Sequence, residues 1–160
     1  AKYIEQIMPS KLDIKLKWPN DVLIDGKKIC GILLETIKFQ NTQFVIIGIG
    51  ANLSKTPAVQ DQIATSLKEE ANIHILPAEF MSGFMSQFDI AYCDWQEKNN
   101  FDRIRQEWKN LAHNLHKDVT VNCGSENISG KFIDIDNSGA IILETRNGNK
   151  VTINHGNLLS

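Results

Sequence analysis

The stretch from Lys17 to Glu35, KWPNDVLIDGKKICGILLE, constrains the fold more than any other part of the chain. It sets cations, an aromatic ring, an amide, a carboxylate and a turn signal between apolar runs. Polar groups at that density are costly to bury unless each has a partner. The stretch is therefore either a β-hairpin with polar ends or a hairpin that carries a site, and the turn by itself favours the plain hairpin.

The hairpin prediction depends on a two-residue turn. An apolar run at 22–24 precedes Asp25-Gly26, a dipeptide typical of turns that need positive φ, and the run 29–34 supplies the return strand. Lys28 follows the turn. Gly31 is a position at which a ligand or another backbone can approach closely.

The residues just before the hairpin do not fit a plain strand. Pro19 removes a hydrogen-bond donor and restricts the residue before it to extended conformations. We expect a rigid elbow that holds Asn20 and Asp21 at the mouth of the hairpin. An alternating strand at 13–18 would deliver Lys17 to this elbow.

Composition excludes several classes of protein. The chain has 160 residues, 42% of them hydrophobic, which is enough to bury a core in one domain or two small ones. Its net charge is −2 with no run of basic residues, so nothing favours nucleic-acid binding. No apolar run approaches the roughly 18 residues of a membrane span. Three scattered cysteines suit a reducing compartment and argue against disulfides or a zinc site.

Strands and helices can be expected along the rest of the chain. Residues 1–8 suit the end of an amphipathic helix, and the nearly continuous apolar run 43–52 suits a central strand. Within that run Gly48 and Gly50 either admit a ligand or relieve crowding, two possibilities of equal weight. Helices are expected at 61–71, 78–98 and 101–115, with the aromatic stripe of 78–98 in the core against the sheet.

From residue 116 the hydrophobic period changes from helical to two. Short strands at 118–123, 128–134, 140–144 and 150–154 indicate a small antiparallel barrel or meander. We place a domain boundary between 1–116 and 117–160. The expected fold class is α+β, with a mixed or antiparallel sheet packed with helices and then a small β-barrel.

Three motifs resemble those of the biotin protein ligases, the enzymes that attach biotin to biotin-dependent carboxylases. KWPND begins at Lys17, KICGILLE begins at Lys28, and GIGAN runs from Gly48 to Asn52. The later segment GKFIDIDNSGAIILE is similar to the small SH3-like C-terminal domain of that family. The motifs stand in the family's order, and the resemblance covers essentially the whole chain.

The resemblance implies a cytoplasmic, ATP-dependent ligase that acts in two steps. The carboxylate of biotin attacks the α-phosphate of ATP, with Mg²⁺, and gives biotinyl-5′-AMP and pyrophosphate. The mixed anhydride then acylates a lysine on the biotin carboxyl carrier protein of acetyl-CoA carboxylase. Fixed donors aimed at phosphate and carboxylate oxygens suit this chemistry. A homodimer is also possible, because an interrupted sheet leaves unpaired backbone groups.

The resemblance also implies roles for individual residues. Lys28 matches the lysine that contacts the acyl-phosphate region, and Asp21 matches the acid that holds the metal or orients the incoming lysine. Gly31 and Gly48 match backbone positions that line the biotin pocket.

Three further polar residues complete the expected site. Asn20 and Asn52 would contact phosphates or metal-bound water, and Asn52 would share the metal with Asp21. Lys17 would pair with Asp21 or with phosphate, whereas Trp18 is expected to pack and fix the elbow.

One departure from the family pattern leads to a further expectation. The family's loop rich in glycine and arginine closes over biotin and the adenylate, and it precedes KWPND; no such sequence precedes Lys17 here. The catalytic domain is thus expected to be N-terminally incomplete and slow to form biotinyl-AMP alone. The alternatives are a lipoate or octanoate transferase relative, and a non-catalytic fragment that binds a carrier or partner at its sheet edge.

Overall fold

The computed structural model describes residues 1–9, 12–57, 63–98 and 101–159, which fall into two compact units. The first unit holds residues 1–15 and 20–84, and the second holds 16–19 and 85–160. Each unit has its own antiparallel sheet and helices, so the α+β fold class is confirmed. The boundary between 116 and 117 remains a prediction about domains.

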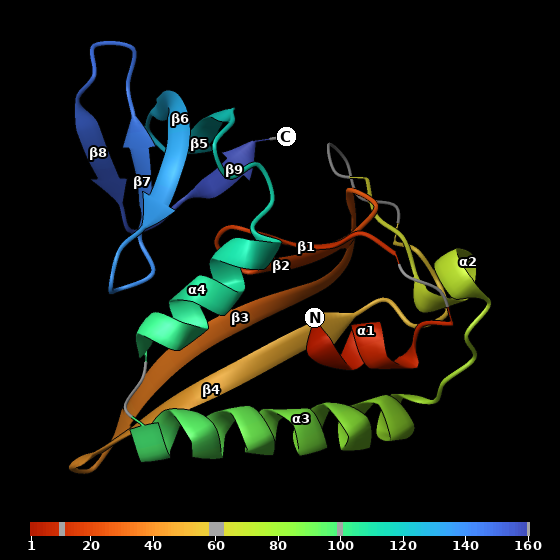
Figure 1. The fold of residues 1–160 in the computed structure, drawn as a ribbon. Helices are drawn as coiled ribbons and strands as arrows, with labels where there is room; N and C mark the ends of the chain where they lie inside the picture. Colours follow the sequence, from red (N-terminus) through yellow and green to blue (C-terminus); the bar gives the residue numbers. More distant parts are fainter. Residues whose placement is uncertain (10–11, 58–62, 99–100, 160) are drawn as a thin grey trace. The chain divides into compact units, whose positions relative to one another are not determined.

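The first unit is built on a four-stranded sheet in the order β1-β2-β3-β4. The strands are β1 (Ile14–Lys17), β2 (Asp21–Ile24), β3 (Lys27–Phe39) and β4 (Thr42–Ala51), and β1 passes into the second unit at residue 16. The helices are α1 (Lys2–Ile7), α2 (Leu67–Ala71) and the first part of α3 (Pro77–Lys98). The predicted N-terminal helix and the predicted hairpin are therefore confirmed (Figure 1).

The turn between β2 and β3 has the predicted geometry. Asp25 and Gly26 have φ of 47° and 77°, the positive values that a two-residue hairpin turn requires. The register pairs Asp21 with Gly31, and a bulge between Val22 and Leu23 shifts the pairing nearer the turn. This register brings the first residue of β2 beside the second motif.

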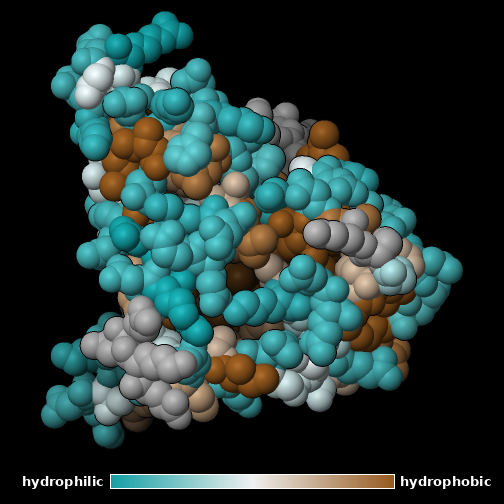
Figure 2. Space-filling view, in the orientation of Figure 1, coloured by the Kyte–Doolittle hydropathy of each residue, from teal (hydrophilic) through white to brown (hydrophobic). Residues whose placement is uncertain are grey.

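The prediction that β4 is a central strand is wrong for the sheet described. β4 ends the strand order, and it pairs with β3 in the long hairpin of Figure 1. Large apolar side chains along both strands are between 43% and 65% exposed, namely Leu33, Leu34, Ile37, Phe39, Phe44, Val45, Ile46 and Ile47. Figure 2 likewise shows apolar side chains, in brown, at the surface among hydrophilic ones. The apolar run reflects a need for burial that the described residues do not meet.

The aromatic stripe of α3 is only partly a core feature. Phe80 is buried and meets Tyr3 of α1 edge to face at 5.2 Å between ring centroids. Tyr92 and Trp95 contact each other but are each 43% exposed, so the core prediction is wrong for these two rings. The helical spacing predicted that these rings share one face of the helix, but it did not predict whether that face is buried.

Two predicted helices are shorter than expected. α2 begins at Leu67 because Ser66 caps it, accepting a hydrogen bond from the backbone N–H of Glu69; residues 61–62 of the prediction lie outside the described residues. α4 (Phe101–Leu111) ends early because the next residues pair with β1: Ala112 forms a parallel bridge with Leu16, and the N–H of His113 donates to its carbonyl.

The second unit contains a five-stranded sheet in the order β8-β7-β6-β5-β9. Its strands are β5 (Asp118–Asn122), β6 (Asn127–Ile135), β7 (Ile141–Glu144), β8 (Lys150–Ile153) and β9 (Asn157–Leu159). The four predicted strands are confirmed, and β9 was not predicted. In the part of the chain that is described, β8 and β9 are the two edge strands of this sheet and do not pair with each other. The sheet is therefore open, whereas a small barrel was expected.

Trp18 belongs to the core of the second unit. It is 4% exposed, packs in the cluster that contains Phe132 and Ile141, and donates from Nε1 to the carbonyl of Gly139 at 3.0 Å. The prediction that Trp18 packs is confirmed, and the prediction that it fixes the elbow remains a prediction.

We expect Trp18→Phe to lower the free energy of unfolding by about 1–2 kcal/mol, because it removes a buried hydrogen bond and leaves a small cavity. Urea denaturation followed by circular dichroism measures this change. Trp95→Phe is the matched control, since the ring of Trp95 is 43% exposed. Equal effects from the two variants would show that Trp18 has no special anchoring role.

Among the helices of the described residues, none is long and apolar enough to cross a membrane.

Candidate functional site

The centre of the candidate site is an ion pair between the first two motifs. Lys28 Nζ lies 2.6 Å from Asp21 Oδ1, and the two side chains are 29% and 14% exposed. Asp21 is the first residue of β2, directly after the elbow, and Lys28 is the second residue of β3 after the turn. The hairpin thus brings together the two residues that were predicted to carry the chemistry.

Glycines line the sheet face next to this pair. A Cβ built on Gly31 would lie 3.2 Å from Lys28 Cε and 3.4 Å from Asp21 Oδ1, so the missing side chain of Gly31 faces the ion pair. Gly50 pairs with Gly31 across the hairpin, and Gly48 pairs with Leu33 one step further. Paired residues and residues two apart share a face of a sheet. We call Gly31, Gly48 and Gly50 the glycine strip.

The glycine strip offers bare backbone beside a cation and a carboxylate. A Cβ on Gly50 would meet no atom within 4 Å. Ile49 and Ala51, which flank Gly50 in β4, lie on the other face of the sheet and line an apolar pocket with Phe80 of α3. The strip therefore lies on the face opposite the apolar contact with α3. Gly50 is the residue of this strip that the expected site omitted.

The two asparagines hold backbone rather than pointing only at a ligand. Asn20 Nδ2 donates to the carbonyl of Ile32 at 2.5 Å, and its own carbonyl accepts from the N–H of Ile32 at 2.9 Å. Asn52 Nδ2 donates to the carbonyl of Thr65 at 2.9 Å and to that of Lys28 at 3.4 Å. Both asparagines fix the walls of the site, and a direct contact with phosphate remains a prediction.

Lys17 is the predicted site residue that lies in the second unit. It ends β1 and is half-buried, whereas Asp21 and Lys28 belong to the first unit. Its contact with Asp21 or with phosphate remains a prediction.

We did not predict from the sequence the hydrogen-bond network next to Lys28 in the chain, which is formed by Thr65, Glu70 and Lys27. Thr65 and Ser66 are almost completely buried, and Thr65 Oγ1 donates to Glu70 Oε1 at 2.5 Å. The same Glu70 oxygen pairs with Lys27 Nζ. A signal was present in the sequence, since Ser66-Leu67-Lys68-Glu69 has the spacing of a capping box and marks the start of α2.

Cys30 is a residue of β3, pairs with Val22 of β2 and is 6% exposed. Burial raises the pKa of the Cys30 thiol, so the side chain stays protonated at neutral pH. We therefore assign Cys30 to packing and not to nucleophilic catalysis.

The Lys27–Glu70 pair predicts an acid dependence of stability. Burial raises the pKa of Glu70, but hydrogen bonds from Lys27 and Thr65 outweigh it, and the pKa is lowered overall. Because the pKa of Glu70 is lowered in the folded protein, its carboxylate stabilises the fold at pH values above the ordinary glutamate pKa of about 4.3. This contribution is lost as the pH falls below that value. Urea denaturation should show a smaller loss of stability for Glu70→Gln than for the wild type as the pH falls below that value. Equal losses for the two proteins would contradict this assignment.

The described residues contain no group of three or more His, Cys, Asp or Glu side chains placed to hold an ion. Asp21 offers a carboxylate and Asn52 an amide oxygen, a set too small for a resident ion but suited to Mg²⁺ that arrives on phosphates.

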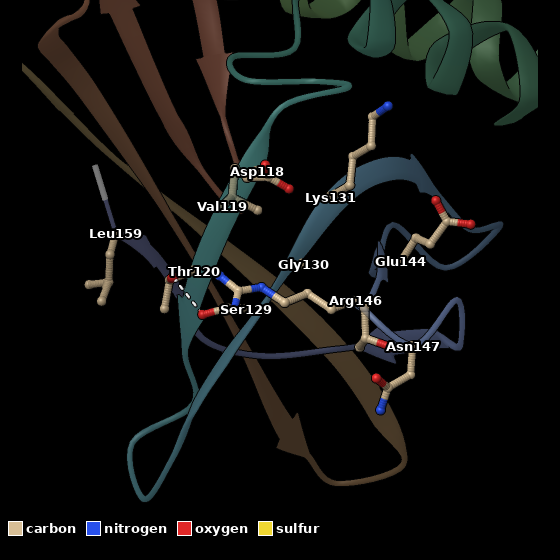
Figure 3. Close-up of a pocket in the computed structure, with 11 residues that line it drawn as sticks. Asp118, Val119, Thr120, Ser129, Gly130, Lys131, Glu144, Arg146, Asn147 and Leu159 are labelled. Atoms are coloured by element: carbon tan, nitrogen blue, oxygen red, sulfur yellow. Dashed lines mark hydrogen bonds between the residues drawn. The ribbon is translucent and has the colours of Figure 1, made fainter.

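A separate groove of about 1,140 Å³ lies on the sheet of the second unit. Figure 3 shows Arg146 reaching toward Thr120 and Ser129, whose hydroxyls are bonded to each other at 2.8 Å, with Lys131 and Glu144 toward the other end. The groove mixes charges of both signs and contains no residue of KWPND, KICGILLE or GIGAN, so we do not assign the candidate site to it.

Comparison with known proteins connects these features to a family. Residues 1–52 match the model of the biotin/lipoate A/B protein ligase family, and residues 116–157 match that of the biotin protein ligase C-terminal domain. Together the two models match more than half of the chain. The chain belongs to the biotin protein ligase family.

Relatives of this ligase-family chain extend the similarity through the helices. It is 34% identical over 153 residues to the bifunctional ligase/repressor BirA of Bacillus subtilis, covering 92% of this chain and 46% of BirA. It is 34% identical over 147 residues to the biotin–[acetyl-CoA-carboxylase] ligase of Paracoccus denitrificans, covering 86% of this chain and 60% of that enzyme. The chain thus spans about half the length of these curated relatives.

Solved structures support the fold of this ligase-family chain. The apo biotin protein ligase of Aquifex aeolicus superposes with a TM-score of 0.81 at 24% identity, over 98% of this chain and 68% of that one. The same enzyme in complex with biotin and ATP gives a TM-score of 0.79, over 98% and 65%. At this identity the likeness shows the fold alone.

Proposed function

We propose that the first unit carries the acyl-adenylate site of a biotin protein ligase and holds biotinyl-5′-AMP across the glycine strip. The observation that carries this proposal is the Asp21–Lys28 ion pair at 2.6 Å beside Gly31. A cation next to bare backbone suits a ligand that joins a charged acyl phosphate to a flat, neutral ring system. The Aquifex aeolicus enzyme was solved with biotin and ATP, and the proposal carries these two substrates over to this chain.

The ion pair has a defined part in this chemistry. In the free site Asp21 satisfies the ammonium of Lys28, and the negative oxygens of the substrates compete for that ammonium. Lys28 then stabilises charge as the biotin carboxylate attacks the α-phosphate and pyrophosphate leaves. In the second step the incoming amine attacks the acyl carbon and AMP leaves. Asp21, released from Lys28, accepts the proton of that amine.

Magnesium enters this proposal only with the nucleotide. Mg²⁺ usually keeps several waters and binds to one or two carboxylates together with substrate phosphates. Asp21 would supply the carboxylate, and Asn52 would have to use its Oδ1, because its Nδ2 donates to two carbonyls. The ion would neutralise charge on the phosphates.

Calorimetric titration with a hydrolysis-resistant phosphodiester analogue of biotinyl-5′-AMP tests the proposed site. We expect one saturable site, with affinity at least about tenfold higher than for the matching lipoyl analogue, a difference of about 1.4 kcal/mol. Stronger binding of the lipoyl analogue would favour a lipoate or octanoate transferase. Absence of binding by either compound would contradict the proposed site.

A second candidate function is that of a fragment that binds a carrier or partner without catalysis. The exposed apolar side chains of β3 and β4, with β4 at the end of the strand order, favour this alternative. An exposed strand edge can pair with another chain. Titration with the apo carrier domain distinguishes the two, because binding that is unchanged in Lys28→Ala, together with no affinity for the adenylate analogue, would support docking alone.

The wider setting of the proposed function follows from the relatives. The name of the Paracoccus denitrificans enzyme supports the biotin carboxyl carrier protein of acetyl-CoA carboxylase as the acceptor. Three free cysteines, Cys30, Cys93 and Cys123, support a reducing compartment such as the cytoplasm. A homodimer remains a prediction, and light scattering of the purified chain measures it directly.

A further inference from the structure

The backbone of Lys28 is held from outside its own hairpin. Its N–H donates to the carbonyl of Ile63 at 2.9 Å, and its carbonyl accepts from the N–H of Thr65 at 2.9 Å. These bonds form an isolated parallel bridge between Lys28 and Ala64. The segment 63–65 therefore binds both polar groups of the lysine backbone.

This segment is itself fixed from both sides. Asn52 Nδ2 donates to the carbonyls of Thr65 and Lys28, which joins the end of β4 to both. The N–H of Leu67 donates to the carbonyl of Asn52 at 3.0 Å, so the first residue of α2 rests on the same asparagine. The bridge at Lys28 is thus part of a closed network.

One carboxylate connects the network to the strand. Glu70 on α2 accepts from Thr65 Oγ1 at 2.5 Å and pairs with the ammonium of Lys27, the neighbour of Lys28. Thr65 is 1% exposed, so its hydroxyl would lose a buried hydrogen bond if Glu70 were removed. Glu70 therefore ties α2 to the strand on one side of Lys28 and to the clamping segment on the other.

We propose that Thr65 and Glu70 are positioning residues that hold Lys28 in register with Asp21 and the glycine strip. The inference rests on the proposed function for its consequence, because a displaced Lys28 matters only if its ammonium meets the acyl phosphate. A misplacement of about 1 Å can cost of order a hundredfold in rate, so a clamp on the lysine backbone contributes directly to the site.

The chain offers a matched control. Thr56 Oγ1 donates to Glu69 Oε2 at 2.6 Å, which is the same kind of threonine–glutamate pair, and its glutamate also lies on α2. That pair is exposed and touches neither Lys27 nor the Lys28 bridge in the hydrogen bonds described. Thr56→Val therefore removes an equivalent bond without releasing the clamp.

The test uses four single variants of the full chain: Thr65→Val, Thr65→Ser, Glu70→Gln and Thr56→Val. Exchange of the Lys28 amide hydrogen is followed by NMR, and affinity for the biotinyl-5′-AMP analogue by calorimetry. We expect Thr65→Val to speed that exchange at least about tenfold and to weaken binding about fivefold or more. Thr65→Ser keeps the hydroxyl and should restore both values, and Thr56→Val should change neither.

A double-mutant cycle separates positioning from general stability. If Thr65 acts through Lys28, Thr65→Val should weaken binding further by less than about twofold once Lys28→Ala is present. Full additivity would overturn the proposal, as would equal effects of Thr65→Val and Thr56→Val. If Thr65→Val does not fold, Glu70→Gln takes its place in the cycle. If the wild-type chain does not bind the analogue, the proposed function fails, and Lys28 amide exchange still decides whether the clamp exists.

Discussion

Replacing Lys28 by alanine should weaken binding of the biotinyl-5′-AMP analogue about 10- to 100-fold. The ammonium lies 2.6 Å from Asp21 in the free site and is the cation that would meet the acyl phosphate. A hydrogen bond to a charged group contributes about 1.5–3 kcal/mol, which corresponds to that range of affinities. Calorimetry measures the affinity, and circular dichroism verifies that the variant is folded.

Lys15→Ala is the matched control for this variant. Lys15 pairs with Asp13 at 3.4 Å in the same unit, and the two side chains are 33% and 63% exposed. Exposed ion pairs contribute little to stability, so this variant should retain the affinity and the stability of the wild type. If Lys28→Ala binds as tightly as Lys15→Ala, Lys28 has no part in the site.

Substitutions in the glycine strip should be the second large effect. Gly31→Ala places a methyl group 3.2 Å from Lys28 Cε and 3.4 Å from Asp21 Oδ1, so the ion pair must shift. We expect at least about a tenfold loss of affinity for the adenylate analogue, with a change in unfolding free energy below about 1 kcal/mol.

Gly50→Ala distinguishes a ligand on the strip from a ligand that contacts the ion pair alone. A Cβ at this position meets no atom within 4 Å, so the free protein should keep its stability. If the ligand lies across the strip, Gly50→Ala should also weaken binding about tenfold. Wild-type affinity in both glycine variants, measured by the same titration, would mean that the ligand does not lie on this face.

The sequence carried most of the site because its signals are local. The Asp25-Gly26 turn sets the register that pairs Asp21 with Gly31. The same turn sets the position of Lys28 beside Asp21. Turn chemistry and alternation act over a few residues, so they can be read without knowing the fold. The ion pair at the centre of the candidate site was therefore predictable in outline.

Long-range partners could not be predicted in this way. The bridge from Lys28 to Ala64 joins residues far apart in the chain, and no pattern in either segment indicates it. The cap at Ser66 was visible as a capping-box spacing, yet its importance comes from Asn52 and Glu70, which meet it only in the folded chain.

The apolar patterns in the sequence did not predict correctly which residues are buried. β4 has the composition of a strand covered on both faces, but it ends the described sheet, and Val45 and Ile47 stay 59% and 43% exposed. The early end of α4 has a similar origin, since pairing of Ala112 with Leu16 replaces another helical turn. A hydrophobic pattern states that burial is favourable and leaves open which element provides it.

A crystal structure of the chain with the biotinyl-5′-AMP analogue tests the central claim most directly. We predict that Lys28 Nζ lies within hydrogen-bond distance of the acyl-phosphate oxygens and that the rest of the ligand lies over Gly31 and Gly50. A ligand bound away from the glycine strip and out of contact with an intact Asp21–Lys28 pair would contradict this prediction.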